Sequence, residues 1–195
     1  MKKITLIVMA LFVTASAFAQ DAQESKNIRW GVKGGINIAS EVAGEASTNS
    51  RTGIHLGGIM ETPISAGVDF QLELLYSMQG ATYKIGNTDY TDKFDYLNVP
   101  FMFKIYVNKN RRFSIDIGPQ LGLMVSAKIS SGNKTVDVYD NDKLNKFDAA
   151  IGLGISYKIK DNFDFVFRAN VSLTPMMDGE EHKNSVGQLG VAYRF

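Results

Sequence analysis

The chain has 195 residues, with 21 Lys and Arg against 20 Asp and Glu, and no cysteine. A net charge of +1 gives no electrostatic basis for binding nucleic acid. The absence of cysteine excludes disulfides and a lipid anchor on cysteine, and the length is that of a single domain.

The first nineteen residues have the three parts of a secretory signal peptide. Lys2 and Lys3 precede an apolar run at Ile4–Phe18, and a small-residue motif ends at Ala19. We expect cleavage after Ala19 and a short periplasmic tail at 20–29. The apolar run is shorter than the ~20 residues of a spanning helix, which disfavours a membrane anchor. Loss of the two lysines leaves 19 basic and 20 acidic residues, a balance of −1.

Eight segments then alternate apolar and polar residues, as expected for β-strands with one apolar and one polar face. The segment Val68–Gln79 is the clearest, and it is longer than the ~5–6 residues typical of soluble strands. A tilted strand needs about 9–11 residues to cross a bilayer. In chain order the expected strands are Trp30–Ala39, Gly53–Thr62, Val68–Gln79, Phe94–Val107, Phe113–Lys128, Lys146–Tyr157, Phe163–Leu173 and Ser185–Phe195.

The connections between these strands alternate between long and short. Polar segments at Gly80–Lys93 and Ile129–Asn145 are expected loops, although part of the first could extend its flanking strands. Outer-membrane barrels have an even number of strands, short periplasmic turns and long extracellular loops. Residues 30–195 therefore predict an all-β, eight-stranded, antiparallel up-and-down transmembrane β-barrel with both ends in the periplasm.

Alternation alone does not separate this fold from a soluble periplasmic ligand-binding barrel. An eight-stranded barrel has room only for side chains or one small ligand, too little for all the bulky apolar faces. Lys or Arg facing lipid would cost roughly 2–4 kcal/mol each. We therefore place the apolar faces outward and expect a plugged polar lumen. Its expected members are Lys33, His55, Glu61, Asp69, Glu73, Lys104, Asp116, Asp148, Arg168 and Arg194.

Aromatic residues gather where the strands approach the short turns, as in an interfacial girdle. Pro100 and Pro119 fall within strands, where each removes a ladder donor, so we expect bulges or irregular pairing there. The girdle residues are Trp30, Phe70, Phe113, Tyr157, Phe163, Tyr193 and Phe195.

Several segments together resemble the Bacteroidetes outer-membrane β-barrel family, which has PorT-like, OmpA-like eight-stranded barrels. The resemblance implies an outer-membrane location and this fold; most members have no assigned activity, and some resemble secretion or gliding components. No residue here selects that role. The segments are Gly31–Ser40, Glu73–Ala81, Tyr96–Tyr106, Ile115–Val125 and Gly190–Phe195.

The last expected strand also resembles a known assembly signal. Alternate residues Leu189, Val191 and Tyr193 lead to the final Phe195, a pattern similar to the C-terminal signal that the barrel-assembly machinery reads. The expected partners are thus the outer-membrane bilayer, that machinery and an unidentified protein at the loops.

Residues that carry chemistry are sparse. Of two histidines, His55 is expected in the lumen and His182 in a charged loop that could also hold a divalent ion. No metal-binding His-Glu-x-x-His spacing and no phosphate-binding glycine loop occur, so we predict no catalytic, cofactor or metal site. The favoured function is a non-enzymatic barrel with a structural, adhesion or partner-binding role through its extracellular loops. A small-solute channel and a membrane hydrolase or acyltransferase stay open.

Overall fold

A computed structural model describes residues 28–42, 49–86, 88–132, 134–141, 144–176 and 183–195. The expected signal peptide, most of the expected tail and His182 lie outside these residues. The described part contains ten strands: β1 (Arg29–Val42), β2 (Asn49–Ser65), β3 (Val68–Gln79), β4 (Ala81–Ile85), β5 (Thr88–Tyr106), β6 (Phe113–Ser131), β7 (Lys134–Asp137), β8 (Phe147–Lys160), β9 (Phe163–Ser172) and β10 (Lys183–Arg194).

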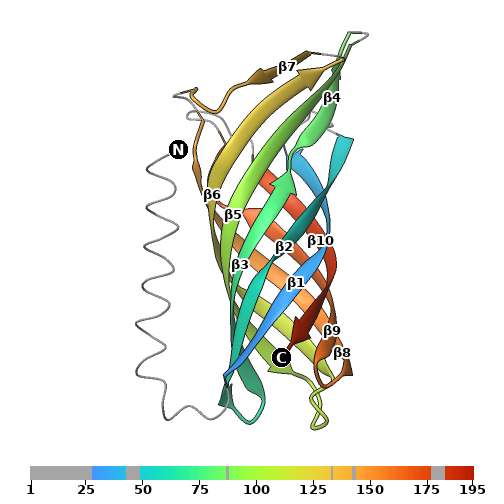
Figure 1. Cartoon of the computed structure of the whole chain (residues 1–195), viewed down its shortest axis with the longest axis vertical. Helices are drawn as coiled ribbons and strands as arrows, with labels where there is room; N and C mark the ends of the chain where they lie inside the picture. Colours follow the sequence, from blue (N-terminus) through green and yellow to red (C-terminus); the bar gives the residue numbers. More distant parts are fainter. Residues whose placement is uncertain (1–27, 43–48, 87, 133, 142–143, 177–182) are drawn as a thin grey trace.

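Eight of these strands close into a ring, which confirms the predicted barrel (Figure 1). Each ring strand pairs antiparallel with its neighbours, and β1 closes the ring against β10, with Gly31 opposite Arg194 and Val42 opposite Lys183. The C-terminus lies at the end opposite β4 and β7. Among the described residues, no helix combines the length and apolar character needed to cross a membrane.

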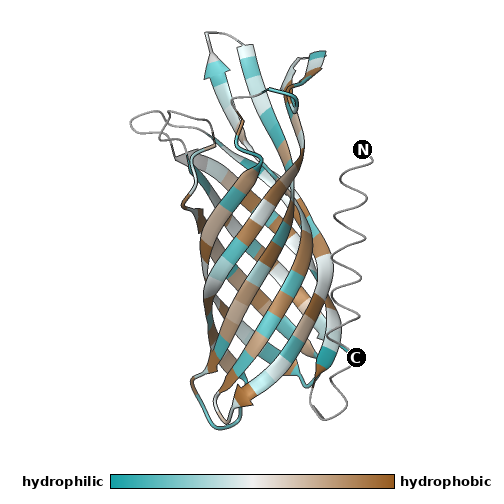
Figure 2. Cartoon of the chain, turned by 90° about the vertical axis from the view of Figure 1, so that its left-hand side faces the viewer, coloured by the Kyte–Doolittle hydropathy of each residue, from teal (hydrophilic) through white to brown (hydrophobic). Residues whose placement is uncertain are grey.

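The apolar side chains face outward and the ionised ones face the axis. Leu153, in the middle of β8, is 55% exposed, whereas Lys33 on β1 is 1% exposed. Brown segments alternate with teal and white ones along the strands nearest the viewer in Figure 2. The expected girdle residues Trp30, Tyr157 and Phe195 are also exposed. This arrangement suits a lipid environment and would expose a broad apolar surface in water.

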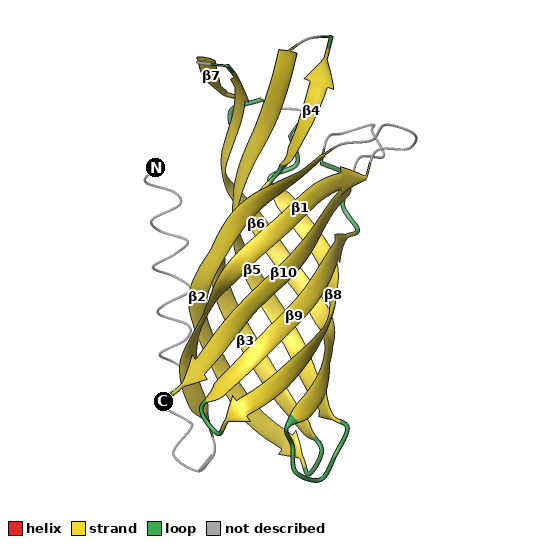
Figure 3. Ribbon diagram, turned by 90° about the vertical axis from the view of Figure 1, so that its right-hand side faces the viewer, coloured by secondary structure: helices red, strands yellow, loops and turns green. Residues whose placement is uncertain are grey.

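A sheet rises beyond the ring on the side of the long connections (Figure 3). Strands β5 and β6 have 19 residues each, and β4 and β7 pair with their extensions. The expected extension of a flanking strand into Gly80–Lys93 is therefore confirmed, whereas β4 within that segment and strand within Ile129–Asn145 were not predicted. Polar residues on both faces of a strand above the membrane hide the alternation on which the prediction depended.

Irregular pairing, one of the two predicted alternatives, occurs at both mid-strand prolines, whereas a bulge occurs at neither. Pairing of β3 with β5 skips Val99 and Pro100, and pairing of β5 with β6 skips Gly118 and Pro119, but the register continues on either side. Shifts occur instead at Pro63/Ser65, Asp95/Tyr96 and Lys158/Lys160. The backbone N–H that proline lacks thus interrupts the hydrogen-bond ladder between the strands, and neither strand carries an extra residue at that point.

One glycine in β2 is required by a close backbone approach. A Cβ on Gly57 would lie 1.9 Å from the carbonyl oxygen of Leu74, whereas a Cβ on its neighbour Gly58 would meet nothing nearer than 4.0 Å. We expect Gly57→Ala to lower the free energy of unfolding by about 1–3 kcal/mol because the strands must separate. Gly58→Ala should change it by less than about 0.5 kcal/mol. Urea unfolding in detergent measures both, and equal effects would contradict the geometry.

Candidate functional site: a sealed lumen

A buried carboxylate holds two cations in the middle of the lumen. Glu73 on β3 accepts from Lys33 Nζ at 2.9 Å, and its two oxygens accept from Arg168 at 2.7 and 3.0 Å. Since the three residues come from β3, β1 and β9, these contacts cross the barrel. Bidentate pairing with Arg fixes the geometry as well as the charge.

A second cluster lies nearer the short turns. Lys104 Nζ reaches Glu61 at 3.2 Å and Asp164 at 2.8 Å, and the Arg194 guanidinium reaches Glu61 at 2.7 Å and Asp164 at 2.8 Å. All four side chains are at most 2% exposed. Because positive and negative groups alternate around the cluster, attraction between neighbouring charges offsets the free-energy cost of removing each of them from water.

The mouth of the lumen at the short turns is closed by residues from strand ends and turns. Asp69 accepts from Tyr106 Oη at 3.0 Å and pairs with Arg111, and Arg29 lies 3.8 Å from the same carboxylate. Arg111 and Lys158 both lie over the Tyr106 ring, at 4.2 and 5.5 Å from its centroid. Although burial opposes it, pairing with Asp69 raises the pKa of Arg111 above its ordinary value, so this side chain stays charged.

Uncharged polar side chains fill the next level. Asn37 Oδ1 lies 2.8 Å from His55 Nδ1 and accepts from Gln188 Nε2 at 3.2 Å, and Asn37 Nδ2 donates to Ser77 Oγ at 2.9 Å. Among the described residues, His55 is therefore a member of a hydrogen-bonded network of uncharged side chains.

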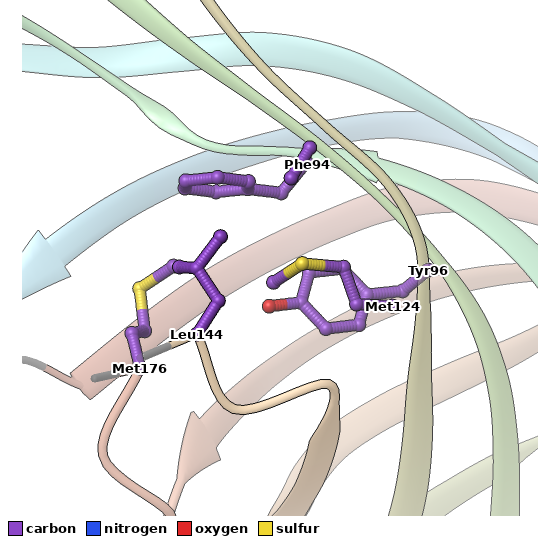
Figure 4. Packing of buried hydrophobic residues seen from close by; sticks show 6 residues of the cluster. Phe94, Tyr96, Met124, Leu144 and Met176 are labelled. Carbon is purple, nitrogen blue, oxygen red and sulfur yellow. The ribbon is translucent and has the colours of Figure 1, made fainter. Parts of the chain in front are cut away.

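Apolar side chains close the opposite end of the lumen, on the side of the long connections (Figure 4). Phe94 and Tyr96 of β5 and Met124 of β6 pack with Leu144 and Met176, which come from the connections that follow β7 and β9. All are less than 9% exposed. The described lumen is therefore sealed twice, by ion pairs toward the short turns and by this apolar cap toward the long connections.

Nine of the ten residues expected in the lumen are buried, and they divide between these layers. The tenth, Asp148, is half-buried and is bound by Ser172 and Thr174, with no ion pair among the described residues. Asp116 accepts from Ser114 and Ser156.

Four residues of the second cluster and of the mouth were absent from the expected lumen set. Asp164 shares its strand face with Arg168, four residues on, and Tyr106 shares its face with Lys104, two residues before it, so alternation was available as a signal for both. Arg29 and Arg111 lie outside the expected strands, where alternation carries no information. Within the described ranges, no group of three or more His, Asp or Glu could hold a metal ion.

Comparison with known families agrees with this architecture. The family described as "Outer membrane protein beta-barrel domain" matches residues 18–178. The chain belongs to that family. It is an integral β-barrel protein of the outer membrane, and its outward apolar surface contacts the bilayer. A soluble periplasmic barrel is excluded by the same findings. No curated protein matches the chain.

Solved structures share the fold of this outer-membrane barrel at low sequence identity. Ail, the attachment invasion locus protein of Yersinia pestis, matches with a TM-score of 0.52 and 17% identity, over 87% of this chain and 99% of that one. Ail in complex with the heparin analogue sucrose octasulfate gives 0.53 and 16%, over 87% and 99%. Neisserial surface protein A gives 0.49 and 16%, over 85% and 97%.

Proposed function

We propose that this outer-membrane barrel is a non-conducting, non-enzymatic protein that presents its extracellular sheet to a partner. The observation that carries the proposal is the double seal of the lumen. Solute passing through would have to separate buried ion pairs such as Glu73–Arg168 and also displace the cap around Met124. Breaking a buried pair costs about 3–5 kcal/mol, so a steady open state is unfavourable.

The sheet that rises from the ring supplies the partner surface. Tyr83 on β4 and Tyr90 on β5 stack with their centroids 5.7 Å apart, and all four residues of β7 are exposed. Tyr side chains give large contact area at low entropic cost, which suits recognition. Adhesion is one form of such binding, and Ail, whose name describes attachment, has the same fold.

Conductance of the purified chain in planar bilayers tests the proposal. We expect no steady current steps, and we expect Phe94→Ala/Met124→Ala, which opens the apolar cap, to stay silent because the ion pairs form an independent seal. Reproducible unitary steps from the wild-type barrel would favour the small-solute channel instead.

Finer assignments belong to the same proposal. We propose membership of the Bacteroidetes PorT-like group, export by a signal peptide cleaved after Ala19, and recognition by the barrel-assembly machinery. The last step would use Leu189, Val191, Tyr193 and Phe195, whose outward faces on and beside β10 support it. Replacing His55 and His182 with Ala should leave any later-assigned activity intact, as a non-enzymatic role requires.

A further inference from the structure

The periplasmic end of the barrel has a strong excess of positive charge. Among the described residues of the short turns and adjoining strand ends, six basic side chains are at least partly accessible, and Asp161 is the accessible acid that accompanies them. The long extracellular connections, in contrast, are acidic on balance. The six bases, hereafter the basic rim, are Arg29, Lys109, Arg111, Arg112, Lys158 and Lys160.

The basic rim is one surface because several contacts join its elements. Arg111 donates to the carbonyl of Ala66 at 2.8 Å, which ties the β5–β6 turn to the β2–β3 turn. The backbone NH of Lys158 donates to the carbonyl of Arg112 at 2.7 Å, which ties β8 to the same turn. Arg111 and Lys158 meet over the Tyr106 ring.

The buried acids beneath the rim neutralise it only in part. Glu61 and Asp164 are shared between Lys104 and Arg194, and Glu61 also pairs with Arg29. Asp69 pairs with Arg111 and lies 3.8 Å from Arg29. The rim bases that make no ion pair with a described residue are Lys109, Arg112, Lys158 and Lys160. Arg111 also has a φ of 53°, the single left-handed non-glycine among the described residues. Such a conformation persists only where the surroundings hold it, here the contacts that fix its guanidinium at the mouth.

The orientation of the rim decides which anion it suits. Arg29 and Lys158 lie on the lumen side of their strands, where Arg29 is 3.8 Å from Asp69 and Lys158 lies over the Tyr106 ring, so both point away from the lipid-facing wall. Guanidinium groups bind carboxylates through paired hydrogen bonds. We infer that the basic rim docks a carboxylate-bearing polymer of the periplasm, of which peptidoglycan, with its acidic peptide stems, is the chemical type.

Co-sedimentation with purified peptidoglycan sacculi tests this inference. The full chain in nanodiscs of zwitterionic lipid should bind at about 0.1 M salt and release as salt rises, because screening weakens exposed charge pairs. Lys109→Gln/Arg112→Gln/Lys160→Gln removes three exposed charges and should weaken binding roughly fivefold. Lys84→Gln/Lys128→Gln/Lys134→Gln changes the net charge equally at the other end and should bind as the wild type does.

Three outcomes would overturn the inference. Equal losses in both triple variants would show a general charge effect. Undiminished binding to sacculi whose carboxylates have been amidated would exclude carboxylate recognition. Rim-dependent binding to phosphatidylglycerol vesicles, with sacculus binding unaffected by the rim variant, would assign the rim to lipid phosphate. Heat-modifiable gel mobility shows whether each variant is folded. The conductance experiment tests the proposed function independently of this inference.

Discussion

Glu73→Gln is expected to lower the free energy of unfolding by about 3–5 kcal/mol, the largest loss among the single substitutions considered. The change keeps the shape of the side chain and removes its charge. Lys33 and Arg168, both at most 1% exposed, then lose the carboxylate that binds them. Two buried cations without a counter-ion face each other across a narrow lumen, and neither can reach water.

Urea unfolding of the barrel in lipid vesicles, followed by gel mobility and Trp30 fluorescence, measures this loss. Asp89→Asn is the matched control, because its ion pair with Lys84 is 66–68% exposed and should be worth about 0–1 kcal/mol. Adding Arg168→Met to Glu73→Gln should recover part of the loss, since one stranded cation is removed. A Glu73→Gln barrel as stable as the control would mean that water reaches the lumen and that the seal is incomplete.

The sequence predicted the ring because every strand that crosses the bilayer must turn apolar side chains toward lipid and polar ones toward the lumen. This requirement gives each spanning strand the same regular alternation. The bounds of β3 were predicted to the residue, and the outward direction of Leu153 and its equivalents was confirmed. Prediction failed above the membrane, where β4 and β7 have only five and four residues, too few for an alternating period to stand out. Pairing with the extended β5 and β6, and of β4 with the start of β2, makes these short segments strands.

Which residues face the lumen and which of them contact one another there are two separate questions. The face of a strand identifies Glu73 and Arg168 as inward, yet they are 95 residues apart and nothing local joins them. Their contact depends on the number of strands and on the register around the whole ring. The apolar cap has the same origin: Leu144 and Met176 come from connections, where no alternation assigns a face.

The second large loss of stability is expected when a charged residue is placed on the outward, apolar face of the barrel. Leu153→Arg places a guanidinium at mid-height on the lipid face of β8 and should cost about 2–4 kcal/mol in bilayers. Ile159→Arg is the matched control on the same face of the same strand, 50% exposed and one residue from its end. Arginine there reaches the headgroups, so the cost should be no more than about 1 kcal/mol.

The same pair of variants separates lipid from water as the surrounding medium. If the outer wall faced water, both substitutions would replace exposed aliphatic side chains with a soluble one, and both would be nearly neutral. A cost that rises with depth in the bilayer requires hydrocarbon around the wall. Equal stabilities for Leu153→Arg and Ile159→Arg, measured by urea titration in vesicles, would therefore contradict the arrangement from which the sealed lumen, the extracellular sheet and the basic rim take their positions.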